Sequence, residues 1–178
     1  MKCFYYLTST LENTREIIDE LHNVGVDDWF IHVLSKDEAG LKKVKIHASN
    51  YLERLDILRY GILGAITGLI VGIIAATLVN STNLFGQEDL PNVAYYSIVG
   101  FFTLFGTWEG GFIGIATENK KISLFHDDLE SGSYLILIYT KEVSEEVVKS
   151  VMEKRSKEVK LVAIDENFYN PLVGLKKI

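Results

Sequence analysis

The sequence contains a single cysteine, Cys3, among its 178 residues. One cysteine cannot form a disulfide within the chain, so an internal disulfide is excluded. Cys3 lies in an apolar stretch that we predict to be a buried strand, and we therefore expect a packing thiol in a reducing compartment. A disulfide between two copies is the alternative.

Clusters of basic residues and catalytic motifs are also missing. The chain has 18 Lys and Arg against 24 Asp and Glu, a net charge of -6, and no basic surface of the kind that binds nucleic acid. It contains no nucleophile elbow, phosphate-binding loop, dinucleotide fingerprint or Cys-x-x-Cys motif. We therefore expect no nucleic-acid partner, no catalytic residue and no cofactor, and a protein that is not an enzyme.

A metal site is not expected either. His126, Asp127 and Asp128 are consecutive, and adjacent positions of a helix do not face one another. No second cluster with ligand spacing accompanies them. We interpret these three residues as a solvated helix face and His32 as a structural histidine in a strand.

What the chain does contain is two long apolar runs, residues 60–79 and 93–117, separated by a polar stretch typical of a turn. The first run has no charged residue and the second has only Glu109. About 20 apolar residues are enough for a helix to cross a bilayer. The runs therefore predict a transmembrane helical hairpin, with the lipid bilayer as the partner of its outer surface.

The basic residues near this hairpin predict its orientation. They flank the apolar runs, and the turn between the runs has none, so by the positive-inside rule both termini should be cytoplasmic. These residues are Lys42, Lys43, Lys45, Arg54 and Arg59 before the first run and Lys120 and Lys121 after the second.

The flanking sequence predicts two strand–helix–strand units. The first comprises residues 2–8, 11–24 and 29–34, and the second comprises 133–140, 144–157 and 160–165. Ser9 and Glu12 have capping-box spacing, and Gly25 follows the first helix where a left-handed residue is favoured. Together the units predict an α+β membrane protein: a ferredoxin-like split βαβ cytoplasmic domain, with the hairpin inserted between strands two and three.

The predicted organisation has five parts. Residues 1–40 and 133–178 form the two halves of the cytoplasmic domain, the latter with a C-terminal tail, and residues 60–117 form the hairpin. Residues 41–59 and 118–132 form juxtamembrane helices. The spacing of Tyr51, Leu55, Leu58 and Ile62 predicts that the first of these continues into the membrane, and Gly132 should end the second.

Three predicted strands are apolar on both faces, so the sheet face without helices should be covered. A second copy of the chain or the juxtamembrane helices are the simplest cover. A small-molecule ligand bound on that open face is the alternative.

Glycines repeat at every fourth residue in both apolar runs. This small-xxx-small pattern allows close packing of helix backbones in lipid. With two such seams in one hairpin, one seam can join the hairpin and leave the other for a neighbour, which predicts a homo-oligomer. The seams are Gly64, Gly68 and Gly72 in the first run and Gly106, Gly110 and Gly114 in the second.

Glu109 is the candidate intramembrane polar site. It lies nine residues before Glu118, about 13 Å along a helix, and should face protein or water rather than lipid. Thr67 lies at a matching depth and is its candidate hydrogen-bond partner. Two interpretations stand: a ring of Glu109 carboxylates that binds or conducts a cation, or a protonated Glu109 bonded to a neighbouring helix.

Several segments resemble a bacterial membrane family of unknown function that is grouped with general stress protein 17M and heat-induced stress proteins. They are residues 31–36, 48–56, 106–108, 111–114 and 119–132. The resemblance covers nearly the whole chain and implies the architecture above, but it brings no established activity or ligand. Where this chain has Glu109, the family usually has an apolar residue.

These observations predict a non-enzymatic inner-membrane protein, stress-related by resemblance. It would self-associate through its glycine-rich helices and use its cytoplasmic domain for scaffolding or sensing. The alternative function is an oligomeric channel or transporter for Mg²⁺ or protons that uses Glu109.

Overall fold

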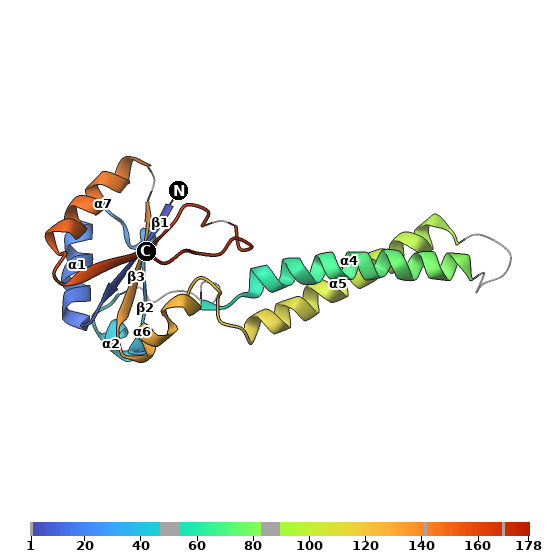
Figure 1. Cartoon of the computed structure of the whole chain (residues 1–178), viewed down its shortest axis with the longest axis horizontal. Coiled ribbons are helices and arrows are strands. Elements are labelled where there is room, and N and C mark those ends of the chain that lie inside the picture. Colours follow the sequence, from blue (N-terminus) through green and yellow to red (C-terminus); the bar gives the residue numbers. More distant parts are fainter. Residues whose placement is uncertain (1, 47–53, 83–89, 141, 169) are drawn as a thin grey trace. The chain divides into compact units, whose positions relative to one another are not determined.

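The computed structural model describes residues 2–46, 54–82, 90–140, 142–168 and 170–178. The chain divides into two compact units (Figure 1). One unit, which we call the sheet unit, combines residues 1–51 with residues 120–178. The other, the hairpin unit, comprises residues 52–119. Segments far apart in the sequence therefore form one body, and the residues between them form another.

The sheet unit is built on a four-stranded antiparallel sheet. Its strands are β1 (Lys2–Thr8), β2 (Ile31–Leu34), β3 (Tyr134–Thr140) and β4 (Val159–Asp165). Their order across the sheet is β2-β3-β1-β4, and every neighbouring pair is antiparallel. The two central strands, β1 and β3, thus come from opposite ends of the sequence.

Helices α1 (Leu11–Asn23) and α7 (Glu142–Lys154) lie along one side of this sheet (Figure 1). Their buried apolar side chains form one core with alternate residues of the strands, among them Phe4, Ile136 and Ile138. Arg155, just after α7, donates hydrogen bonds to Glu16 and Glu20 of α1. The bond from Arg155 holds the pKa of Glu20 below its usual range.

The cap of α1 differs from the prediction. Thr10, not Ser9, is the N-cap, and its hydroxyl accepts a hydrogen bond of 3.2 Å from the backbone N–H of Asn13. Both residues carry a hydroxyl, but Ser9 lies one position too early because the helix begins at Leu11. At the other end, Gly25 has a φ of 88°, which confirms the predicted left-handed residue.

We expect Thr10→Ala to lower the free energy of unfolding by about 1 kcal/mol, because the first turn of α1 loses its side-chain acceptor. Ser9→Ala is the matched control and should change it little, since Ser9 is exposed and does not cap the helix. Urea unfolding of the purified protein, followed by circular dichroism, measures both. A larger loss for Ser9→Ala would contradict the assignment.

The opposite sheet face is covered by the chain itself. Segment η2 (Ser123–Phe125), helix α6 (His126–Glu130) and the C-terminal residues pack there. Phe125 is fully buried and its ring stacks on that of Tyr5, with centroids 5.8 Å apart. The C-terminal tail also bonds to β4, where the N–H of Ile178 donates to the carbonyl oxygen of Val162. The predicted covering of this face is therefore confirmed, and both covering segments belong to the same chain.

Several predicted segments have other bounds in the structure. Helix α7 spans Glu142–Lys154 instead of residues 144–157. Residues 28–30 form a 3₁₀ turn, η1 (Asp28–Phe30), so β2 begins at Ile31 instead of residue 29. The predicted helix running from Tyr51 into the hairpin is also wrong: Leu55 forms an isolated β-bridge, and the long helix begins at Ile57. Tyr51 itself lies outside the described residues. In the described part of the predicted segment 41–59 before residue 47, the chain forms the end of the short helix α2 (Glu38–Lys43).

The segment after the hairpin is likewise shorter than predicted. Helix α6 covers five residues, not the whole of 118–132, because Glu118 pairs with Leu55 and residues 123–125 form a 3₁₀ turn. Gly132, with a φ of 91°, follows it at the predicted stop.

Candidate functional site

The hairpin unit consists of helices α4 (Ile57–Ser81) and α5 (Asn92–Ile115). Each is long and apolar enough to cross a membrane. Only 17% of the most apolar window of α4 and 11% of that of α5 is buried. The core helix of a water-soluble protein would be mostly buried, so these helices present their apolar side chains outward.

The glycines of the two helices face each other. A Cβ atom added at Gly64 would lie 2.0 Å from the carbonyl oxygen of Gly106, and one at Gly68 would lie 2.2 Å from that of Phe102. A Cβ atom added at Gly110 would likewise lie 2.1 Å from the carbonyl oxygen of Tyr60. Such distances leave no room for any side chain, so the helix backbones approach as closely as glycine allows.

Both glycine seams are used inside the hairpin. Gly72 faces Val99, and Gly114 faces Ile57, so the six glycines singled out in the sequence all line the contact between α4 and α5. The expectation that one seam would be left for a neighbouring copy is therefore wrong. Periodicity identifies the residues that share a helix face, but it does not identify the helix that lies opposite.

A short β-bridge between Leu55 and Glu118, which no pattern in the sequence predicts, closes the base of the hairpin. The backbone N–H of Asp56 donates to the carbonyl oxygen of Thr117 at 3.0 Å, and that of Asn119 donates to Arg54 at 2.9 Å. The buried Asp56 carboxylate also accepts a hydrogen bond of 3.1 Å from Arg59. These bonds fix the two helix ends to each other.

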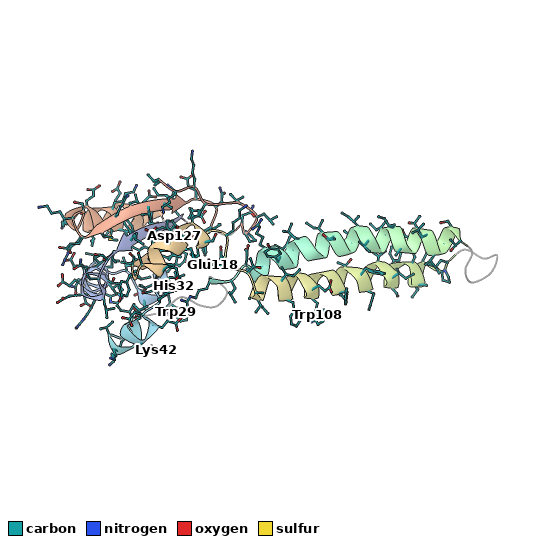
Figure 2. The ribbon with its side chains drawn as sticks, turned by 60° about the horizontal axis from the view of Figure 1, so that its bottom comes forward. Trp29, His32, Lys42, Trp108, Glu118 and Asp127 are labelled. Carbon is teal, nitrogen blue, oxygen red and sulfur yellow. The ribbon has the colours of Figure 1, made fainter. Side chains whose placement is uncertain are left out.

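The outer surface of α5 carries a ladder of aromatic rings. Phe101, Phe105, Trp108 and Phe112 follow one another at steps of four, three and four, with centroid distances of 6.1, 5.8 and 4.8 Å. Trp108 is 59% exposed and points away from α4 (Figure 2). In water, such a surface would be an association or aggregation site.

A groove of about 450 Å³ runs along one side of the hairpin. Its floor consists of glycines from both helices, which are Gly64, Gly68, Gly106 and Gly110. Its walls are apolar side chains, which include Leu63, Val71, Phe102, Phe105 and Ile113. The groove follows the glycine seam, where the two backbones meet and the neighbouring side chains stand on either side.

Glu109 and Thr67 both line this groove. Glu109 is exposed and has neither a hydrogen bond nor an ion pair with any described residue. The Thr67 hydroxyl donates to the carbonyl oxygen of Leu63 at 2.9 Å rather than to Glu109. Helix α5 ends at Ile115, so Glu109 lies about 9 Å from the helix end instead of 13 Å.

The other residues singled out in the sequence lie in the sheet unit. The ring of His32 meets that of Tyr139 edge-on at 5.2 Å, and Asp128 pairs with Lys177 at 3.1 Å. His126 and Asp127 are exposed, and Figure 2 marks Asp127 and His32. Among the described residues, no three His, Cys, Asp or Glu side chains are placed to hold a metal ion.

Sequence reasoning missed a buried ion pair between Lys121 and Asp165. The Lys121 ammonium lies 2.6 Å from the Asp165 carboxylate and also donates to the carbonyl oxygen of Asn167 at 3.3 Å. Both residues are buried, with exposures of 7% and 4%. Lys121 therefore pairs within the sheet unit instead of standing as a free surface charge.

Comparison of the sequence with models of protein families and with curated proteins gives no match. The resemblance to the stress-protein family therefore remains a prediction from the quoted segments.

Proposed function

We propose that this chain is an integral protein of the bacterial inner membrane, in which α4 and α5 cross the bilayer as a hairpin. The observation that carries the proposal is the exposure of apolar side chains around both helices, although each is long enough to span the hydrocarbon core. In lipid this apolar surface contacts hydrocarbon chains, whereas in water it would promote aggregation. The basic residues before α4 favour cytoplasmic termini.

The proposed cytoplasmic part is a ferredoxin-like domain interrupted by the hairpin. Its support is the strand order β2-β3-β1-β4, together with the sequence order β1–α1–β2 and β3–α7–β4. These are the strand order and the two split βαβ units expected for that fold. The hairpin falls between β2 and β3 in the sequence.

The proposed function is non-enzymatic and consists of scaffolding or sensing at the membrane. The protein would self-associate, and its relation to stress comes from the family resemblance. The glycines are used within the hairpin, and the aromatic ladder of α5 is an exposed surface on which a second copy can pack. Aromatic pairs contribute about 0.5–1.5 kcal/mol each beyond the area that they bury. A ligand on the covered sheet face would have to displace Phe125 and its neighbours.

Sedimentation equilibrium in a neutral detergent tests self-association. We expect the wild type to form an oligomer and Trp108→Ala to weaken it, while Leu69→Ala, an exposed residue on α4, serves as control. A wild type that stays monomeric at every protein-to-detergent ratio would contradict this part of the proposal.

A second candidate function is the passage of Mg²⁺ or protons. It is favoured by the Glu109 carboxylate within the predicted span, which has no ion-pair partner among the described residues. Intramembrane acidic residues commonly mark ion pathways. Flux into liposomes should then be lost in Glu109→Gln and kept in His126→Ala, since His126 lies in the sheet unit. Flux equal to that of empty liposomes would contradict this candidate.

A further inference from the structure

The groove of the hairpin combines an apolar lining with one acidic group. Glu109 is the only charged residue from Tyr60 to Ser81 and from Asn92 to Ile115, so no basic side chain of the two helices can neutralise it beyond Arg59 at the base. It has no hydrogen-bond or ion-pair partner among the described residues. A carboxylate at membrane depth costs about 2.5 kcal/mol or more unless it meets a partner.

The size of the groove favours a small molecule as that partner. Its volume of about 450 Å³ falls within the range of about 300–1,000 Å³ that is usual for ligand pockets. On α4 it extends from Tyr60 to Val71, about 16 Å of a helix that is about 37 Å long.

The chemistry of the groove argues against two other occupants. A Mg²⁺ ion held by one groove alone would need about six oxygen ligands, some of them waters, whereas one groove offers few oxygens besides the Glu109 carboxylate and the Thr67 hydroxyl; a Mg²⁺ pathway would need Glu109 from several chains. A second copy related by two-fold symmetry would bring two Glu109 carboxyl groups together, and in a low dielectric they could not both stay ionised.

We propose that this groove binds a lipophilic organic monocation, such as a quaternary ammonium or phosphonium ion with aryl or alkyl arms. The cationic centre lies at the Glu109 carboxylate, and the arms contact Leu63, Phe105 and Ile113. The same low dielectric that makes an unpaired carboxylate costly strengthens its attraction to a cation. The proposal does not depend on the oligomeric state.

Tetraphenylphosphonium and tetraphenylborate provide the sharpest test, because the two ions have nearly the same size and shape but opposite charge. Equilibrium dialysis of each labelled ion against the full-length protein in a neutral detergent, corrected with empty micelles, measures binding. We expect saturable binding of the cation, one per hairpin, and no saturable binding of the anion. Equal binding of both ions, or no saturable binding of either, would overturn the proposal.

Two variants test the position of the site. Glu109→Gln should weaken binding of the cation by about tenfold or more, since it removes the charge partner. Asp127→Asn, an acid of the sheet unit, should leave binding unchanged. Leu63→Ala should weaken it several-fold, whereas Leu69→Ala, on the same helix outside the groove, should not. Retained affinity in both Glu109→Gln and Leu63→Ala would overturn the assignment.

One further measurement distinguishes a ligand from a second copy in the groove. In a Cys3→Ser background, Thr67→Cys should remain uncrosslinked under mild oxidation, because no second copy lies over the groove. Efficient disulfide formation between two chains at this position would show that a neighbour occupies the groove and would overturn the proposal.

Discussion

Gly110→Ala is expected to destabilise the hairpin, whereas Gly111→Ala on the very next residue should stabilise it. A Cβ at Gly110 would lie 2.1 Å from the carbonyl oxygen of Tyr60, so the helices must separate to admit it. Overpacking of this kind costs about 1–3 kcal/mol. A Cβ at Gly111 meets nothing within 4 Å, and alanine is a better helix former than glycine by about 0.8–1.0 kcal/mol.

Titration of the purified protein with sodium dodecyl sulfate in mixed micelles, followed by far-ultraviolet circular dichroism, measures both variants. The same chemical change at adjacent residues should shift the unfolding midpoint in opposite directions. Shifts of the same sign would mean that the glycine seam does not form the contact between α4 and α5.

The second large effect is expected at the buried ion pair of the sheet unit. Lys121→Met should lower the free energy of unfolding by about 3–5 kcal/mol, because it leaves the Asp165 carboxylate buried without its cation. Lys120→Met is the matched control: the neighbouring lysine is exposed, and its loss should cost less than about 0.5 kcal/mol. Urea unfolding of the full-length protein in detergent measures the difference.

A double variant separates the ion pair from general damage to the fold. Lys121→Met combined with Asp165→Leu removes both charges, and replacing a buried pair by apolar residues is often neutral. The double variant should therefore be more stable than Lys121→Met alone. A double variant at least as unstable as the sum of both single variants would show that the two charges do not stabilise each other.

Much of the local structure could be predicted because it depends on short-range patterns. Strand β1 has the predicted bounds, since an apolar run bounded by polar residues is a short-range signal. The long helices differ from the predicted runs by only a few residues at each end. The ends of helices were less predictable. Ser9 and Thr10 are both residue types that cap helices well, and Thr10 is the cap because α1 begins at Leu11.

The partner of a residue could not be predicted where it lies far away in the sequence. Lys121 looked like a membrane-flanking surface charge, because nothing nearby reveals Asp165, 44 residues later. The glycine seams were recognised, but a periodic pattern does not tell which helix packs against which. Counting residues along each helix placed Glu109 and Thr67 at a matching depth. The groove that both residues line could not be predicted, because it depends on the full geometry of the hairpin.

The β-bridge at the hairpin base illustrates the remaining difficulty. Leu55 falls in step with a helical apolar pattern, yet it pairs with Glu118 across the two ends of the hairpin. Bringing these ends together requires the antiparallel packing of α4 and α5, which is a property of the folded unit and not of the local sequence. Periodicity alone therefore favoured a continuous helix at this point.

The central proposal is that α4 and α5 cross a bilayer with both termini on the cytoplasmic side. Labelling of single cysteines in a Cys3→Ser background with a membrane-impermeant maleimide tests it directly. In intact bacterial spheroplasts, Asn92→Cys at the start of α5 should be labelled, and Asp127→Cys in the sheet unit should react only after lysis. Labelling of both cysteines only after lysis, with the protein recovered in the soluble fraction, would contradict the account.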